Sequence, residues 1–114
     1  MILVDTSVWI DHLRKGDAAL EEALMNGEVL THSFVIGELA CGNIANRREI
    51  LDLLAELPRA REATHEEVMA MVDRRRLMGR ELGYVDAHLL AASLLTPETR
   101  LWTRDRRLAA LVRE

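Results

Sequence analysis

Three short apolar runs, separated by longer helical segments, limit this chain to a small number of folds. Ile2–Val4 are entirely apolar and lead into Asp5, as expected of a strand buried on both faces of a sheet. Residues 29–31 and 100–103 are predicted to form two further strands. No Asn-Gly or similar turn joins two alternating runs, so hairpins are not expected. The sequence therefore predicts an α/β fold with a small parallel sheet flanked by helices.

The intervening segments carry signals for the starts and ends of helices. Ser7 is expected to cap a first helix that Gly16 ends, and Asp17 is expected to start a second. Thr64 and Glu67 have the spacing of a capping box. The predicted helices cover residues 7–15, 17–26, 47–57, 65–79 and 85–95, with one that begins near residue 34 and one from residue 106 to the end.

Length and composition restrict the class of protein. The 114 residues are expected to form one domain, spanning 1–114, and a hydrophobic fraction of 49% is enough for a core without disulfides. Cys41 is the only cysteine, which favours a reducing, cytoplasmic setting. Residues 1–5 lack the basic start of a signal peptide, and no run of about 18 apolar residues is present to span a membrane.

The charge distribution bears on whether nucleic acid is a partner. A formal net charge of −4 argues against it. However, Lys15 is the only lysine among 15 basic residues, and the others are arginines, whose planar guanidinium groups bind phosphate in a bidentate manner. These arginines either contact phosphate or pair with glutamates on helix faces, and the sequence leaves both interpretations open. The clusters are Arg47 and Arg48, then Arg74, Arg75, Arg76 and Arg80, then Arg104, Arg106 and Arg107.

Two carboxylates lie in segments that are otherwise apolar. On a helix, Glu38 falls on a stripe of apolar or small residues, and so does Asp86. Each is therefore expected to point toward the core side of its helix. The stripe of Glu38 contains Phe34, Val35, Cys41 and Gly42, and that of Asp86 contains Leu89, Leu90 and Ser93.

Two further carboxylates follow predicted strands. Asp5 stands at the carboxyl end of the first strand and Asp105 just past the third, at the edge where parallel α/β folds bind ligands. Plainer interpretations exist, because Asp86 can be an N-cap after Tyr84 and Val85, and Asp105 can cap the last helix. These explanations account for each acid singly but not for four together.

The energetics of converging acids predict a bound cation. An unpaired buried carboxylate costs several kcal/mol. Two carboxylates about 4 Å apart repel by roughly 4 kcal/mol at an effective dielectric constant of about 20, whereas a domain has only about 5–15 kcal/mol of net stability. An all-oxygen donor set favours Mg²⁺ or Mn²⁺ over Zn²⁺. Cys41 is expected to be a buried, inert thiol. The histidines show no ligand spacing and are expected at the surface or the core edge: His12, His32, His65 and His88.

Four segments that contain these acids resemble, in order and approximate spacing, the successive signatures of PIN domains, and the resemblance covers nearly the whole chain. The size and the early Asp-Thr-Ser opening are most similar to the VapC toxins of prokaryotic type II toxin–antitoxin pairs. The segments are Val4-Asp5-Thr6-Ser7-Val8, Glu38-Leu39-Ala40, Asp86-Ala87-His88-Leu89-Leu90-Ala91-Ala92 and Thr103-Arg104-Asp105-Arg106-Arg107-Leu108.

This resemblance implies a PIN-like three-layer sandwich and a Mg²⁺- or Mn²⁺-dependent endoribonuclease that cleaves RNA phosphodiester bonds. It also implies a homodimer and a cognate VapB-like antitoxin that occupies the acidic pocket. The catalytic and metal-binding roles fall on Asp5, Glu38, Asp86 and Asp105, with Thr6 and Thr103 as supporting hydrogen-bond donors. Such domains usually continue into a further strand, whereas this chain stops at Arg113-Glu114. The sheet is therefore expected either to lack that last strand or to have an edge covered by a partner.

The sequence disfavours two other classes of function. An aspartyl phosphotransfer enzyme on a doubly wound sheet, as in haloacid dehalogenase-like phosphatases, needs a second Asp two positions after the first, and Ser7 occupies that position. A receiver domain needs a late lysine, and none follows Lys15. A catalytically inert PIN-like interaction module is expected to have lost some of the acids, yet all four are present.

Overall fold

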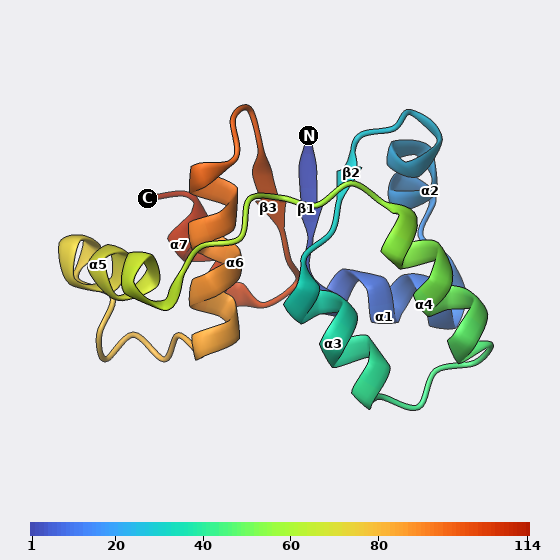
Figure 1. The fold of residues 1–114 in the computed structure, drawn as a ribbon, viewed down its shortest axis with the longest axis horizontal. Coiled ribbons are helices and arrows are strands. Elements are labelled where there is room, and N and C mark those ends of the chain that lie inside the picture. The colour runs from blue at the N-terminus through green and yellow to red at the C-terminus, as the bar shows by residue number, and fades with distance from the viewer.

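The computed structural model describes residues 1–114 and contains one parallel sheet of three strands in the order β2-β1-β3 (Figure 1). The strands are β1 (Ile2–Val4), β2 (Val29–Leu30) and β3 (Arg100–Trp102). Leu3 of β1 pairs with Leu30 on one side and with Leu101 on the other. Because β1 is central, all three of its side chains are buried. The predicted parallel α/β fold is confirmed.

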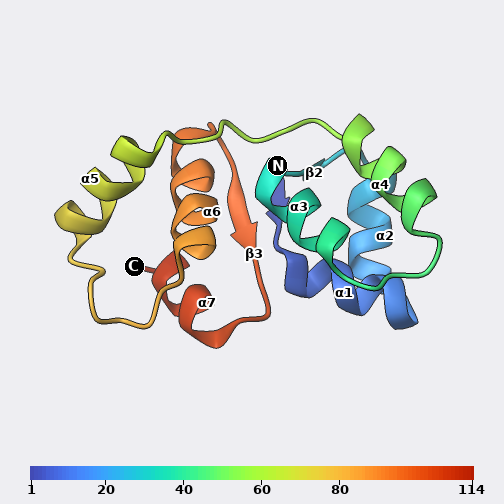
Figure 2. The same ribbon diagram turned by 60° about the horizontal axis from the view of Figure 1, so that its bottom comes forward.

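Seven helices surround this sheet. In Figure 1, α1 to α4 lie on one side of the central strand and α5 to α7 on the other. The α6 helix and the α7 helix both contact β3, and α5 packs on α6 as the outermost element, as Figure 2 shows from a second direction. The helices are α1 (Thr6–Lys15), α2 (Ala18–Met25), α3 (Ser33–Cys41), α4 (Arg47–Glu56), α5 (His65–Arg75), α6 (Tyr84–Leu95) and α7 (Arg106–Val112).

Most predicted helix boundaries are confirmed, and two are wrong. Asp17 caps α2, and Thr64 forms a capping box with Glu67 at the start of α5. The α1 helix begins at Thr6, so Asp5 occupies its N-cap position and Ser7 lies inside the helix, where its hydroxyl donates to the Asp5 carboxylate. The α5 helix ends at Arg75, where the next residue adopts a left-handed conformation, and not at Gly79.

Burial along the helices follows their contacts with the sheet. The α6 helix is buried continuously from Ala87 to Ser93 because β3 and α5 cover two of its faces. Its nearly uniform apolar sequence is typical of a helix inside a core. By contrast, α3 buries only Val35 and Leu39. No helix in the structure has the length and apolar character needed to cross a membrane.

Three predictions about burial are wrong. Cys41 is exposed at the end of α3, since the buried face of that helix runs through Val35 and Leu39 instead. His32 and His88 are 1% and 5% exposed, not at the surface or the core edge. The Nε2 atoms of both histidines are buried without a hydrogen-bond partner.

Candidate active site

Asp5 is the most constrained carboxylate at the carboxyl edge of the sheet. Its backbone N–H donates to the carbonyl of Trp102 at 2.9 Å, which extends the ladder between β1 and β3. The residue is only 6% exposed. The hydroxyls of Ser7 and Thr103 both donate to Asp5 Oδ2, at 2.8 and 2.7 Å. Two hydrogen bonds to one oxygen fix the orientation of this carboxylate.

Asp105 lies just after β3 and is connected to Asp5 through Thr103. Its backbone N–H donates to Thr103 Oγ1 at 3.1 Å. Its Oδ1 accepts from the backbone N–H groups of Arg107 and Leu108, at 2.9 and 3.1 Å, and thereby caps α7. Asp105 is therefore a helix cap, as the plainer interpretation predicted. Both capping bonds use Oδ1, so capping is compatible with a second role for Oδ2.

Glu38 is brought to this edge by the contact between α1 and α3. Its Oε1 accepts from Thr6 Oγ1 at 2.7 Å, and Thr6 is the residue directly after Asp5. The start of α1 therefore hydrogen-bonds to two of the acids, through Thr6 and Ser7. Glu38 itself is exposed, so the prediction that it points toward the core is wrong.

Asp86 experiences the electric field of the other three acids. It lies in the first turn of α6 and is partly buried. Burial raises the pKa of Asp86, and the charges of Asp5, Asp105 and Glu38 raise it further, with partial opposition from the backbone amide of Gly83. Asp86 therefore interacts electrostatically with the other three carboxylates. We call these four residues the acid cluster.

No basic side chain forms an ion pair with any member of the acid cluster. The ion pairs of the structure are Arg80–Glu114, Arg104–Asp11, Arg104–Asp17 and Arg107–Glu81. The arginines of two predicted clusters are thus partly used in pairs with surface acids, as one of the two interpretations held. The repulsion within the acid cluster is left without a protein counter-ion.

The donor set of the acid cluster suits a hard divalent cation. All its side-chain donors are carboxylate oxygens, the ligands that Mg²⁺ and Mn²⁺ prefer. No three His, Cys, Asp or Glu side chains lie close enough together in this structure to hold one metal ion. Mg²⁺ usually keeps several waters and binds through one or two carboxylates, so a complete protein shell is not required. The residues present therefore fit this group chemically.

Besides Glu38, the structure differs from the sequence predictions at two positions of this site. Asp86 is not an N-cap, because Gly83 occupies that position and Asp86 lies inside the helix. Ser7 was missed as part of the site, although it donates to Asp5 and accepts from the backbone N–H of Arg104 at 3.1 Å. Its position two residues after a strand-terminal Asp was the available signal.

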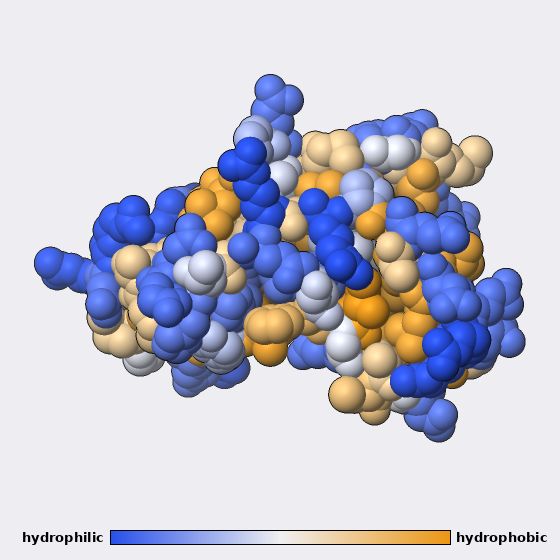
Figure 3. Space-filling model, in the orientation of Figure 1, coloured by the Kyte–Doolittle hydropathy of each residue, from blue (hydrophilic) through white to orange (hydrophobic).

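A separate apolar hollow lies away from the acid cluster. It is formed between α1, α2 and α4, has a volume of about 460 Å³, and is lined mainly by apolar side chains. Figure 3 shows hydrophobic side chains on this half of the molecule, over α1 and α4. Its lining includes Trp9, Leu13, Leu24, Ile50 and Leu57. Since it contains no member of the acid cluster, it is not part of the candidate active site.

The fold and the acid cluster agree with one protein family. Residues 2–114 match the PIN domain family, and the chain belongs to it. The chain is also similar to Ribonuclease VapC32 from two strains of Mycobacterium tuberculosis, CDC 1551 / Oshkosh and ATCC 25618 / H37Rv. Each relative is 55% identical over 114 residues, which is 100% of this chain and 92% of the relative. No solved structure matches the chain. These findings confirm the resemblance to VapC-type PIN domains.

Proposed function

We propose that this chain is an endoribonuclease that cleaves RNA phosphodiester bonds and acts as the toxin of a VapBC-type pair. The observation that carries the proposal is the acid cluster, which forms no ion pair with a basic side chain. Burial, and then the charges of the other three acids, raise the pKa of Asp86. The full-length similarity to a protein named Ribonuclease VapC32 supports RNA as the substrate.

We further propose that the acid cluster binds Mg²⁺ or Mn²⁺, with Asp5 and Asp86 as principal ligands and Glu38 and Asp105 completing the site directly or through water. Such an ion supplies Lewis-acid chemistry, since it lowers the pKa of a bound water and stabilises charge on a scissile phosphate. The absence of any paired arginine or lysine at these four acids supports this proposal.

The chain's own residues position the acids for this role. Ser7 and Thr103 hold Asp5 in one orientation, and Thr6 does the same for Glu38. Preorganised ligands need no rearrangement when substrate binds. Arg106 is exposed, lies next to Asp105 and belongs to none of the ion pairs, so it is available to contact a flanking phosphate.

The test is RNA cleavage in the presence of Mn²⁺. Asp5→Asn and Asp86→Asn keep the size of the side chain but remove its charge, and each is expected to abolish detectable cleavage. Asp52→Asn, on the exposed surface of α4, is the matched control and should cleave like the wild type. Wild-type cleavage by a folded Asp5→Asn or Asp86→Asn variant would remove that residue from the mechanism.

The VapBC assignment also implies partners and a place of action. We propose a VapB-like antitoxin that covers the acidic pocket, a homodimer of the chain, and a cytoplasmic location. Light scattering of the purified chain measures the oligomeric state. Cleavage assays with added antitoxin should show loss of activity, and unchanged cleavage in a stable complex would contradict a blocked pocket.

A further inference from the structure

The only phenylalanine and the only tyrosine of the chain lie together beside the acid cluster, and both are exposed to solvent. Phe34 is 36% exposed on α3 and Tyr84 is 48% exposed at the start of α6. Large aromatic side chains are usually buried, so two exposed rings in one place indicate a binding surface.

These two rings line one shallow groove that reaches the acid cluster. The groove has a volume of about 600 Å³ and lies between α3 and the first residues of α6. Phe34 and Glu38 are four residues apart on α3, so they lie on the same face of that helix. Glu38 itself lines the groove, which makes the groove continuous with the acid cluster. Its other lining residues include Gly37, Cys41 and Val85.

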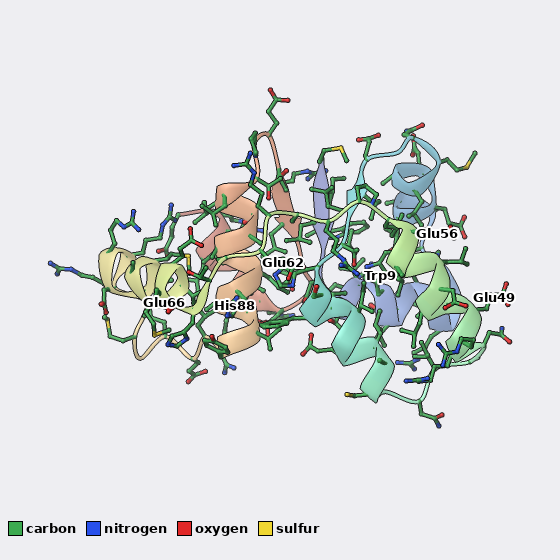
Figure 4. The ribbon with its side chains drawn as sticks, in the orientation of Figure 1. Trp9, Glu49, Glu56, Glu62, Glu66 and His88 are labelled. Carbon is green, nitrogen blue, oxygen red and sulfur yellow. The ribbon has the colours of Figure 1, made fainter.

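The two rings are held in place by three histidines. His88 packs edge-on against both of them, with ring centroids 4.7 Å from Phe34 and 4.6 Å from Tyr84. Phe34 also packs against His32 at 5.2 Å, and the Tyr84 hydroxyl lies 2.8 Å from His65 Nδ1. Figure 4 shows His88 on α6, with Glu62 between α6 and α3. Rings that are fixed before binding lose little conformational entropy when they contact a ligand.

Gly37 leaves the surface of α3 open between these rings. A Cβ atom at this position would meet no other atom within 4 Å. Glycine inside a helix is usually unfavourable relative to alanine, and no steric contact in the structure requires it here. The lack of a side chain therefore leaves room for a flat group beside Phe34.

We propose that this groove binds one unpaired nucleobase of the RNA substrate, stacked against Phe34 and Tyr84, next to the phosphate that the acid cluster receives. The proposal rests on the proposed function and deepens it. Unpaired bases stack on aromatic side chains in most single-strand RNA sites, and such stacking tolerates many sequences. The groove would therefore favour RNA with an unpaired base at the cleavage point over a paired helix.

The direct test compares two labelled RNAs by fluorescence anisotropy. One is a mixed-sequence single-stranded RNA, and the other is the same ribose-phosphate backbone with abasic sites throughout. All proteins carry Asp5→Asn, so that no RNA is cleaved during the measurement. The parent protein is expected to bind the RNA with bases about 5- to 150-fold more tightly than the abasic RNA, which is the range in Kd known for stacking of a single base. Without base stacking, this preference is lost.

Three variants should lose this preference. Phe34→Leu and Tyr84→Leu keep an apolar side chain but remove a ring face, and Gly37→Leu fills the open surface without removing a ring. The control is Leu94→Ala, which changes a side chain on the same helix that is 49% exposed but outside the groove. It should keep the preference of the parent protein.

Two outcomes would overturn the stacking proposal. The first is that the parent protein binds both RNAs equally or binds neither. The second is that the three variants keep the parent's preference. If light scattering also shows that these variants have a changed oligomeric state, the groove is a protein interface. Cleavage by the chain without Asp5→Asn is measured separately. If the chain cleaves RNA but shows no base preference, only the stacking proposal is refuted. If it shows a base preference but does not cleave RNA, only the proposed nuclease function is refuted.

Discussion

Thr103→Val tests whether the hydrogen bonds at Asp5 hold the acid cluster in place. Valine keeps the shape of threonine but removes the hydroxyl that donates to Asp5 Oδ2 at 2.7 Å and accepts from the Asp105 N–H at 3.1 Å. A hydrogen bond to a charged group contributes about 1.5–3 kcal/mol. Asp5 is only 6% exposed, so water cannot readily replace the lost donor.

This loss translates into a measurable fall in melting temperature. Unfolding entropy is about 2.1 cal/mol/K per residue, which for 114 residues is about 0.24 kcal/mol/K. Thr103→Val should therefore lower the Tm by about 6–12 °C in thermal unfolding with EDTA, at a fixed protein concentration. It should also slow RNA cleavage, because Asp5 loses one of its two orienting bonds.

The matched control is Thr99→Val. Thr99 Oγ1 donates only to the carbonyl of Pro97, at 3.0 Å in a turn, and its loss should have a much smaller effect. Equal melting temperatures for Thr103→Val and Thr99→Val would refute the view that Thr103 stabilises a buried charge.

Three further changes test other parts of the structure. Thr64→Ala removes the capping hydroxyl of α5 and should reduce the free energy of unfolding by about 1 kcal/mol in urea, and no change would mean that the capping box does not form. Burial lowers the pKa of His32, so below about pH 6.5 the unfolded state binds more protons than the folded state. The free energy of unfolding should therefore decrease as the pH is lowered from about 6.5 to the lowered pKa. His32→Asn should flatten this slope, and an equally steep slope would assign it to other groups. Arg104→Ala breaks exposed ion pairs with Asp11 and Asp17 and should reduce the free energy of unfolding by less than about 1 kcal/mol. High salt should remove this difference. A larger loss of stability that does not depend on salt would contradict a surface role for Arg104.

Local signals in the sequence were sufficient for much of the fold. Three features depend on neighbouring residues only, and all were predicted correctly. They are the strand at Ile2–Val4, the start of α2 at Asp17 and the capping box at Thr64. The end of α5 depends on tertiary contacts instead. The chain leaves the helix at Arg76 and buries Leu77, which is 3% exposed, and a sequence pattern does not reveal that burial.

The identity of the candidate site residues was also available from the sequence, but their surroundings were not. Asp5 and Asp105 follow strands, and parallel strands end at one edge. The orientation of α3 could not be predicted, because that helix is apolar on more than one face and periodicity does not say which face the core covers. Glu38 and Cys41 were therefore expected to be buried and are exposed.

Metal-dependent stability is the most direct test of the central claim that four unpaired carboxylates repel one another until a divalent ion binds. In EDTA, Asp86→Asn should melt at or above the wild-type temperature. The substitution removes a carboxyl group whose charged form is disfavoured, since burial and three other acids raise its pKa. With Mn²⁺ at about 100 times its Kd, the wild type should gain about 2.7 kcal/mol, and Asp86→Asn should gain much less. Equal Mn²⁺ effects on both proteins, or an Asp86→Asn protein that is less stable in EDTA, would contradict the account.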